Sequence, residues 1–219
     1  MQDLYEAWCR DPRSMTFGEF LDEVHRQKED GAPASPMGLD IEAANLYLEC
    51  RRRIDNGERF AIGYVHLDHF KEYRERYGRD RSTRVISLLA RILRDVVTRR
   101  CPTDGVVAQV GKDAFSFVIP VDAIVDVCGQ ALGMFDNEIA LQYDARDSRA
   151  AGAASEQHPD GESQRISLIE LKIGVVANDE RNIAHPAQMT ELAMEMLSYA
   201  MSQPGSVFII DRRHEPADG

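Results

Sequence analysis

Two short apolar segments that flank a turn constrain the fold of this chain more than any other feature. Residues 106–110 read Val-Val-Ala-Gln-Val, residues 115–119 read Phe-Ser-Phe-Val-Ile, and Gly111-Lys112-Asp113-Ala114 lie between them. Glycine and aspartate between two apolar runs of this length are typical of a turn that joins antiparallel strands. The segment therefore predicts a β-hairpin that carries the acidic Asp113 at its tip.

A second strand is predicted upstream of the hairpin, over residues 60–67, where an apolar run leads into the polar residues Asp68 and His69. Around these strands, helical and strand-like patterns alternate along the chain. Elements in this order predict an α/β (α+β) sandwich, with helices packed on a mostly antiparallel sheet. The other expected elements are helices over 41–54, 83–98, 122–141 and 187–202, and strands over 166–176 and 207–210.

Residues 1–35 predict a helical arm followed by a linker. Phe17, Phe20, Leu21 and Val24 fall on one helical stripe, and residues 31–36 are glycine, proline and other small residues. The arm has two interpretations. It is either a helix that packs on the main domain, or a helix that binds a partner or a second copy of the chain.

The main domain is expected over residues 36–213, followed by a short tail at 214–219. Within the domain, residues 144–164 are small and polar and show neither a helical nor a strand period. Such a segment predicts a long mobile loop, and an unstructured insert is preferred there over a functional element.

Composition excludes several classes of function. The net charge of −11 argues against a surface for duplex nucleic acid, because neutralising phosphates needs clustered Lys and Arg. The one basic cluster, residues 51–53, lies in a helical pattern and is interpreted as a solvated face. Four widely spaced cysteines predict reduced, mostly buried thiols. With no signal-like N-terminus and no apolar run near about 20 residues, we expect a cytoplasmic protein without membrane insertion.

Six short motifs, in the right order, resemble the GGDEF domain, the catalytic module of diguanylate cyclases. The resemblance covers about residues 36–213 and implies a palm-like fold, with a central five-stranded, mainly antiparallel sheet flanked by helices. The hairpin corresponds to the segment that gives this family its name. The six motifs are residues 35–42, 67–71, 76–78, 85–90, 172–176, and 204–206 together with 211–213.

The resemblance implies two metal-binding acids, and this chain keeps one of them. The first position falls on His66, whereas the second falls on Asp113. Mg²⁺ prefers oxygen ligands, and imidazole suits zinc, copper or nickel better. Asp68 faces the same side of an extended strand as His66 and is a candidate substitute, displaced by two residues.

Other positions that the family uses for nucleotide binding also differ here. The two guanine-recognising positions fall on Arg74 and Thr83, and an arginine cannot accept a hydrogen bond from the base. In the hairpin, the second glycine is replaced by Lys112 and the second acidic residue by Ala114. The lysine expected to hold triphosphate falls on Met201. Together these losses predict a domain without turnover, because charged contacts to the transition state are absent.

Two weaker sites are also considered. The resemblance implies a product-binding site, for which Arg100 and Asp104 are candidates, although they stand one residue further apart than the family spacing. A slipped loop could still present both to a nucleotide, but surface charges beside a turn are preferred. His66, His69 and Asp113 could form a transition-metal site, but hydrogen-bonded histidines at a strand end are preferred, and no metal or cofactor is expected.

These observations lead to three hypotheses. The first is a catalytically inactive, degenerate GGDEF-like domain that acts by protein–protein interaction in bacterial signalling or localisation, with homodimerisation as one form of that interaction. The second is a sensor that binds GTP or cyclic di-GMP without turnover, using Arg100, Asp104 and Asp113. The third is an active nucleotide cyclase with altered metal or substrate choice, using Asp68 and Asp113. The first is preferred.

Overall fold

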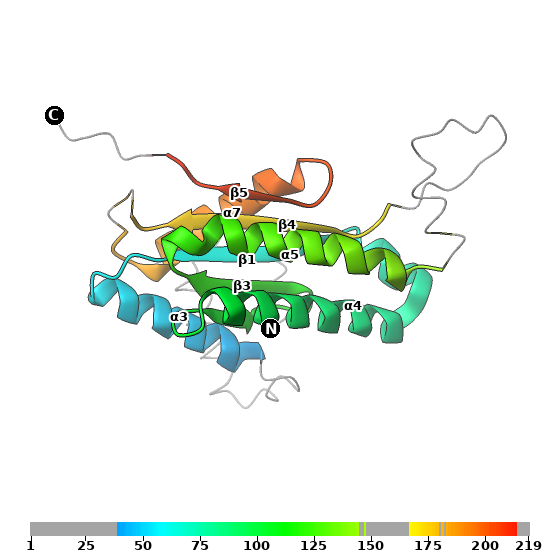
Figure 1. The fold of residues 1–219 in the computed structure, drawn as a ribbon, viewed down its shortest axis with the longest axis horizontal. Helices are drawn as coiled ribbons and strands as arrows, with labels where there is room; N and C mark the ends of the chain where they lie inside the picture. Colours follow the sequence, from blue (N-terminus) through cyan, green and yellow to red (C-terminus); the bar gives the residue numbers. More distant parts are fainter. Residues whose placement is uncertain (1–38, 145–146, 148–166, 180, 182, 214–219) are drawn as a thin grey trace, which may run out of the picture.

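The computed structural model describes residues 39–144, 147, 167–179, 181 and 183–213 of the 219-residue chain (Figure 1). The predicted arm with Phe17, Phe20, Leu21 and Val24, the tail, and most of the predicted loop 144–164 lie outside the described residues. The helices and strands are α3 (Leu39–Asp55), β1 (Ala61–Asp68), α4 (Phe70–Arg100), β2 (Val106–Gln109), β3 (Ala114–Ile119), η1 (Val121–Ala123), α5 (Ile124–Ile139), η2 (Ala140–Gln142), β4 (Glu170–Ala177), α7 (Pro186–Met201) and β5 (Val207–Ile210).

The five strands form one sheet in the order β2-β3-β1-β4-β5. The pairs β2–β3, β3–β1 and β1–β4 are antiparallel, and the edge pair β4–β5 is parallel, which confirms the predicted mainly antiparallel sheet. Strand β1 lies at the centre, and its register runs from Ala61 opposite Ile119 and Ala177 to Asp68 opposite Glu170. A central strand covered by helices on both faces reads as a nearly continuous apolar run, which explains the pattern at 60–67.

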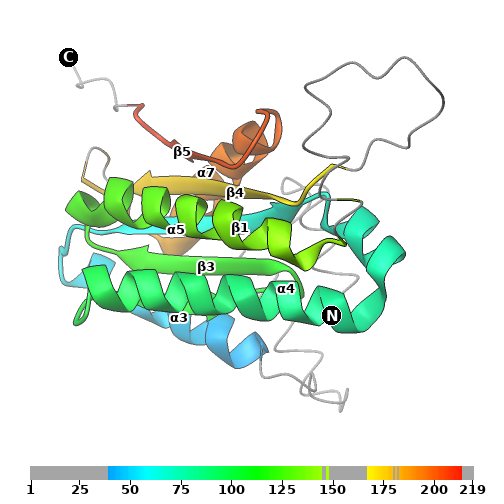
Figure 2. The same ribbon diagram turned by 45° about the vertical axis from the view of Figure 1, so that its right-hand side comes forward.

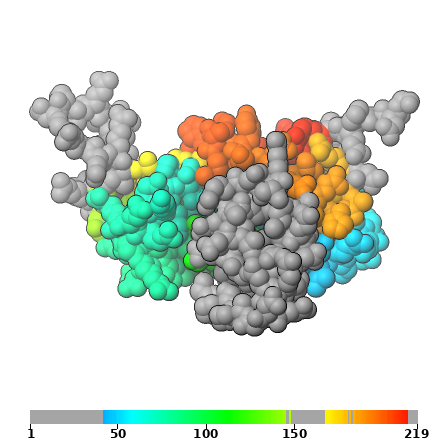
Figure 3. All heavy atoms as spheres, turned by 180° about the vertical axis from the view of Figure 1, so that it is seen from behind, coloured from blue at the N-terminus to red at the C-terminus, as the bar shows by residue number. Residues whose placement is uncertain are grey.

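Helices cover both faces of the sheet. Figures 1 and 2 show α4 and α5 side by side across one face, and Figure 3, seen from behind, shows α7 in orange and α3 in blue on the other. Successive strand residues point to opposite faces, so β3 sends Phe115, Phe117 and Ile119 into the core under α4 and α5. Strand β1 sends Ile62 and Tyr64 to the core under α3 and α7.

Helix α4 departs from the prediction, because it begins at Phe70 instead of residue 83. Phe70, Tyr73 and Tyr77 form a short apolar stripe at i, i+3 and i+7, but charged residues occupy most of the other positions from 71 to 81. The two parts meet at a kink at Gly78, whose φ of 79° is a left-handed conformation that glycine adopts without steric cost. The first part of α4 packs Phe70 and Tyr73 in the core, but its apolar stripe is short and is followed by the kink, so the prediction began at the longer stripe after residue 83.

Three of the four cysteines lie in the described residues, and all three are free and buried, as predicted. Burial raises the pKa of the Cys50 thiol to about 12, and it does the same for Cys128. Thiols in such surroundings stay protonated at neutral pH, so neither is a candidate nucleophile or metal ligand.

The interpretation of residues 51–53 as a solvated face is wrong for one of the three. Arg53 is only 5% exposed, and its guanidinium donates to Glu49 Oε1 at 2.7 Å and to the carbonyl oxygen of Asp104 at 2.7 Å. Its carbon Cζ also lies 5.7 Å from the centre of the Phe60 ring. Arg53 thus links α3 to the turn before β2, a contact that the sequence pattern of one helix cannot reveal.

Glu49 gives this part of the fold a pH dependence. The hydrogen bond that Glu49 accepts from Arg52 is the main cause that lowers the Glu49 pKa from 4.5 to about 2. Burial of the carboxylate raises the pKa, whereas the hydrogen bond from Arg53 lowers it further. Because the folded pKa lies below the unfolded one, the stabilisation is present above pH 4.5 and is lost as the pH falls towards 2. We expect Glu49→Gln to lower the free energy of unfolding by about 1 kcal/mol at pH 7. Urea titrations should show this difference disappearing near pH 2.

Glu191→Gln is a matched control, because Glu191 is exposed on α7 and the described residues place no hydrogen bond or ion pair on it. This variant should unfold at the wild-type urea concentration across the same pH range. A Glu49→Gln effect that persisted unchanged at pH 2 would contradict the assignment.

Candidate functional site

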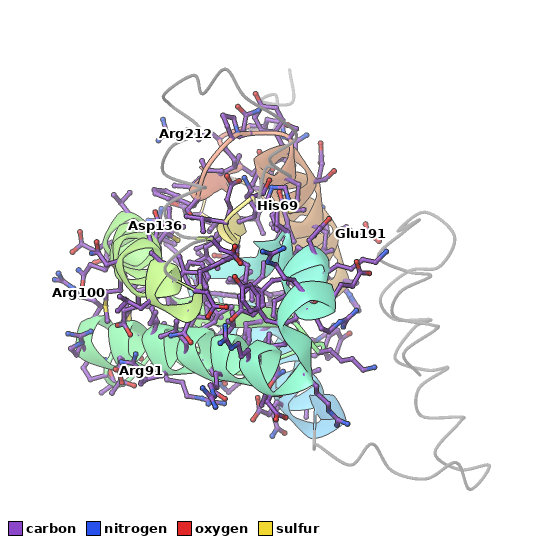
Figure 4. All side chains as sticks on the ribbon, turned by 90° about the vertical axis from the view of Figure 1, so that its right-hand side faces the viewer. His69, Arg91, Arg100, Asp136, Glu191 and Arg212 are labelled. Carbon is purple, nitrogen blue, oxygen red and sulfur yellow. The ribbon has the colours of Figure 1, made fainter. Side chains whose placement is uncertain are left out.

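Several residues with predicted functional roles lie around one end of the central strand. At this end of β1, His66 pairs with Ala114 of β3 on one side and with Lys172 of β4 on the other. Asp68 follows two residues later, opposite Glu170. Figure 4 views the molecule from this end, and His69 lies near the centre of the view. The sheet register therefore brings the end of β1, the hairpin and the start of β4 together.

The predicted hairpin is confirmed, and one side chain stabilises its turn. Gln109 donates from Nε2 to the carbonyl oxygens of Gly111 and Lys112, at 3.0 and 3.2 Å. The backbone N–H of Gln109 donates to Glu42 Oε2 at 2.7 Å, which ties the hairpin to α3. Hydrogen bonds from Nε2 to two successive carbonyls restrict the conformations open to the turn, and they hold the backbone just before Asp113.

Asp113 is half-buried and immediately precedes the start of β3. In the part of the chain that the structure describes, its carboxylate takes part in no hydrogen bond and no ion pair. An acid without an internal partner remains available to a cation or to a ligand. Ala114, the next residue, is buried and contributes no polar atom, and Lys112 projects from the turn as an exposed side chain.

Arg74 and Thr83 lie on α4, on either side of the Gly78 kink, and both are exposed. The Thr83 hydroxyl donates back to the carbonyl oxygen of Arg79 at 3.0 Å, so it serves its own helix. No ion pair holds Arg74 among the described residues. These two positions therefore present a cation and an internally bonded hydroxyl, which do not reproduce the amide and carboxylate expected of a guanine-recognising pair.

A cluster of aromatic and charged side chains packs against α4 near the Gly78 kink. The rings of Tyr73, Tyr77 and Tyr143 have centroid distances of 4.6 to 5.6 Å, and Arg76 donates to both carboxylate oxygens of Asp147 at 2.7 and 2.8 Å. Tyr77 also donates to Asp147. The Asp147 contact raises the pKa of Arg76 above its usual value. These contacts attach the chain beyond α5 to α4, close to Arg74 and Thr83.

Lys172 is a residue of this region that the sequence pattern did not single out. Its side chain is fully buried, and Nζ donates to Glu170 Oε2 at 2.7 Å and to the carbonyl oxygens of Gln203 and Gly205 at 2.6 Å each. A charged residue inside the apolar run 171–176 was the available signal. Because an ammonium has three protons, all of its donors are used. Met201, where the resemblance predicts a triphosphate-binding lysine, is half-buried at the end of α7.

Arg100 and Asp104, the candidates for a product-binding site, each contact a different neighbour. Arg100 ends α4, and its guanidinium lies 3.4 Å from Asp126 Oδ2 of α5, while Asp104 Oδ2 accepts a hydrogen bond from Thr103 at 2.9 Å. Both side chains are exposed, and Figure 4 shows Arg100 at the margin of the molecule. Asp126 is the neighbour of Arg100 and Thr103 is the neighbour of Asp104, an arrangement typical of surface charges beside a turn. A role of Arg100 and Asp104 in nucleotide binding stays a prediction.

One set of candidate metal ligands is present among the described residues. It consists of Asp68, His69 and Glu170, whose potential ligand atoms all lie within 4.8 Å of one another. The combination of His66, His69 and Asp113 considered from the sequence does not meet this distance. The difference arises because Asp68 and Glu170 are cross-strand partners, a relationship that only the β1–β4 register determines.

Comparison with protein families assigns the fold. The family model described as "Diguanylate cyclase, GGDEF domain" matches residues 43–206. The chain belongs to the GGDEF domain family. This confirms the resemblance drawn from the six motifs and the palm-like fold. No similar chain was found among curated proteins. In the described part of this GGDEF domain, no helix is both long and apolar enough to cross a membrane.

Solved structures agree with this fold. The active GGEEF domain of a diguanylate cyclase from Vibrio cholerae has a TM-score of 0.55 at 17% identity, covering 78% of this chain and 94% of that chain. The GGDEF domain of YfiN from Pseudomonas aeruginosa has a TM-score of 0.54 at 20% identity, covering 80% and 94%. Diguanylate cyclase SiaD from the same organism, solved in complex with its activator SiaC, has a TM-score of 0.53 at 14% identity, covering 88% and 68%.

Proposed function

We propose that this GGDEF domain has lost diguanylate cyclase activity and acts in the cytoplasm by binding a protein partner in a bacterial signalling or localisation system. The observation that carries the proposal is the replacement of the strand-end acid by His66, beside a hairpin that keeps only Asp113. Two-metal phosphoryl transfer needs oxygen ligands that hold Mg²⁺ over the reacting phosphate. One carboxylate and one imidazole do not supply such a pair.

The environment of Asp68 weakens the hypothesis of an active cyclase with altered metal choice. Its Oδ1 accepts the backbone N–H of His69 at 2.9 Å, and its cross-strand partner is Glu170 of β4, on the side of β1 away from the hairpin. A metal held by Asp68 would therefore be drawn towards β4. The ammonium of Lys172 lies near the end of α7, but all three of its protons are used in internal hydrogen bonds. It cannot replace the missing triphosphate lysine without breaking these bonds.

A protein partner is supported by likeness to SiaD, whose structure was solved with its activator SiaC. The candidate surfaces are the arm with Phe17, Phe20, Leu21 and Val24, and the altered pocket with His66, Arg74, Asp113 and Met201. A second copy of the chain is one such partner. Sedimentation of the purified protein across a concentration series will determine whether it self-associates.

The test of lost activity is incubation of the purified chain with GTP and either Mg²⁺ or Mn²⁺, followed by chromatographic product analysis. We expect no cyclic dinucleotide above the no-enzyme blank, because the first metal-binding acid and the base-recognising pair are both replaced. The active GGEEF domain from Vibrio cholerae, assayed in parallel, is the positive control. Product formation that is abolished by Asp113→Ala would overturn the proposal and support the altered cyclase.

The sensor hypothesis rests on the unpartnered carboxylate of Asp113 and on the exposure of Arg100 and Asp104. Calorimetry with GTP and with cyclic di-GMP on the same samples separates it from the first proposal. Binding without product, weakened by Asp113→Ala or Arg100→Ala, would identify a sensor. Absence of heat with both nucleotides would leave protein binding as the function.

A further inference from the structure

Three side chains with the chemistry of metal ligands meet where β1 ends beside β4. Asp68 and Glu170 stand opposite each other across the antiparallel pair, and His69 is the next residue along the chain. A ring nitrogen of His69 and a carboxylate oxygen of each acid lie within 4.8 Å of one another. The group supplies one nitrogen and two oxygen donors. It differs from positions 66 and 113, where the GGDEF resemblance places the metal acids.

The backbone at His69 directs its ring towards this group. With φ 60° and ψ 11°, His69 is the only non-glycine residue with positive φ in the described part of the chain. It occupies the N-cap position of α4, yet its side chain makes no capping hydrogen bond. The ring lies beside Asp68 instead, with Nε2 3.9 Å from Asp68 Oδ2. A histidine that does not cap its helix is free to coordinate.

Lys172 orients the third ligand. Its buried ammonium donates to Glu170 Oε2 at 2.7 Å, so the other oxygen of that carboxylate, Oε1, remains for a cation. A hydrogen bond of this kind to a coordinating carboxylate is a common outer contact of metal sites and fixes the ligand's direction. The positive charge of Lys172 offsets part of the negative charge of the two carboxylates. Because one of the three donors is an imidazole nitrogen, the site is expected to favour a transition-metal ion over magnesium or calcium.

We propose that Asp68, His69 and Glu170 bind one divalent transition-metal ion, with zinc as the best match. Tetrahedral zinc accepts histidine and carboxylate ligands at about 2.0–2.2 Å, which requires donor atoms about 3.3 Å apart. The side chains must therefore approach one another by up to about 1.5 Å. Their exposed fractions of 24%, 33% and 28% leave room for that adjustment. Magnesium is disfavoured because it prefers six oxygen ligands.

Three protein ligands leave the fourth zinc position open to water or to a small anion. This metal site does not depend on the proposed loss of cyclase activity, since it uses a different set of residues and requires no nucleotide. Zinc binding would hold β1, the first turn of α4 and β4 together at the end of the sheet that carries the hairpin.

The test is titration of the full chain with Zn²⁺ by calorimetry and with Co²⁺ by visible absorption, which reports coordination geometry. We expect one equivalent of each ion and the intense visible bands of four-coordinate cobalt. His69→Asn should weaken binding by at least about 30-fold, because one of three ligands is lost. Asparagine is chosen because it tolerates the left-handed backbone of this position, so the fold should be kept. Glu170→Gln should weaken binding similarly.

His185→Asn is the matched control. His185 is an exposed histidine at the N-cap of α7, where Nδ1 accepts from the Ala187 N–H at 3.3 Å, and asparagine can cap a helix in the same way. This variant should bind both ions as the wild type does. No binding with a dissociation constant below about 100 μM, which corresponds to about −5.5 kcal/mol, would overturn the proposal. Binding that His69→Asn leaves unchanged, or that His185→Asn weakens equally, would also overturn it.

Discussion

Replacing Lys172 by methionine is expected to lower the free energy of unfolding by about 3 kcal/mol, and the midpoint of thermal unfolding by roughly 10 °C. Methionine keeps most of the length of the side chain but none of its three donors. The change leaves Glu170 Oε2 and the carbonyl oxygens of Gln203 and Gly205 without the ammonium that now binds them. Charged hydrogen bonds at a fully buried side chain are worth more than those at the surface.

Lys71→Met is the matched control, because Lys71 is an exposed lysine on the first turn of α4. It should change the unfolding free energy by less than about 0.5 kcal/mol. Combining Lys172→Met with Glu170→Gln completes a double-mutant cycle. The double variant should lose less stability than the sum of the two single variants, since each removes the same ion pair. Equal losses of unfolding free energy for Lys172→Met and Lys71→Met would show that the internal hydrogen bonds of Lys172 do not stabilise the fold.

Gly174→Ala is expected to destabilise the domain by at least about 3 kcal/mol. A Cβ atom at this position would lie 2.2 Å from the Leu197 nitrogen and 2.3 Å from the Ala193 carbonyl oxygen, both on the backbone of α7. A side chain can rotate away from such a contact, but a helix backbone must move as a unit. Helix α7 would be displaced from β4, against which it makes its largest interface. Denaturant unfolding monitored by circular dichroism measures the loss.

Gly129→Ala provides the control for the same chemical change. Gly129 lies in α5, and an added Cβ there would meet no atom within 4 Å. Since alanine is favoured over glycine inside a helix, this variant should gain about 0.5–1 kcal/mol. A Gly174→Ala protein as stable as the wild type would mean that α7 does not pack on β4 as closely as described.

Local patterns were sufficient for much of the fold. The hairpin, the central strand and β5 at Val207–Ile210 appear at or near their predicted positions, because each is a short apolar run bounded by turn residues. The helical period also located α3, α5 and α7 to within a few residues. The beginning of α4 was missed, because its apolar stripe spans only Phe70, Tyr73 and Tyr77 and is followed by the glycine kink at residue 78.

The candidate site was only partly accessible from the sequence. Motif order predicted which positions differ from those of an active cyclase, among them His66, Arg74 and Met201, because the residue type at each position can be read without the fold. It could not show that the Lys172 ammonium binds Glu170 and two carbonyls beyond α7, since those partners are brought together by the fold. Nor could it show that Arg53 is buried against the turn at Asp104.

The sequence alone determined the order and type of most elements and the GGDEF resemblance, and it led to the hypothesis that residue types of the family's site have been lost. The tertiary structure alone decided which distant residues meet. Asp68 and Glu170 are neighbours because of the β1–β4 register, and the left-handed backbone of His69 places its ring beside them. Residue pattern encodes local conformation and burial, whereas the register between strands far apart in the chain depends on the packing of the whole core.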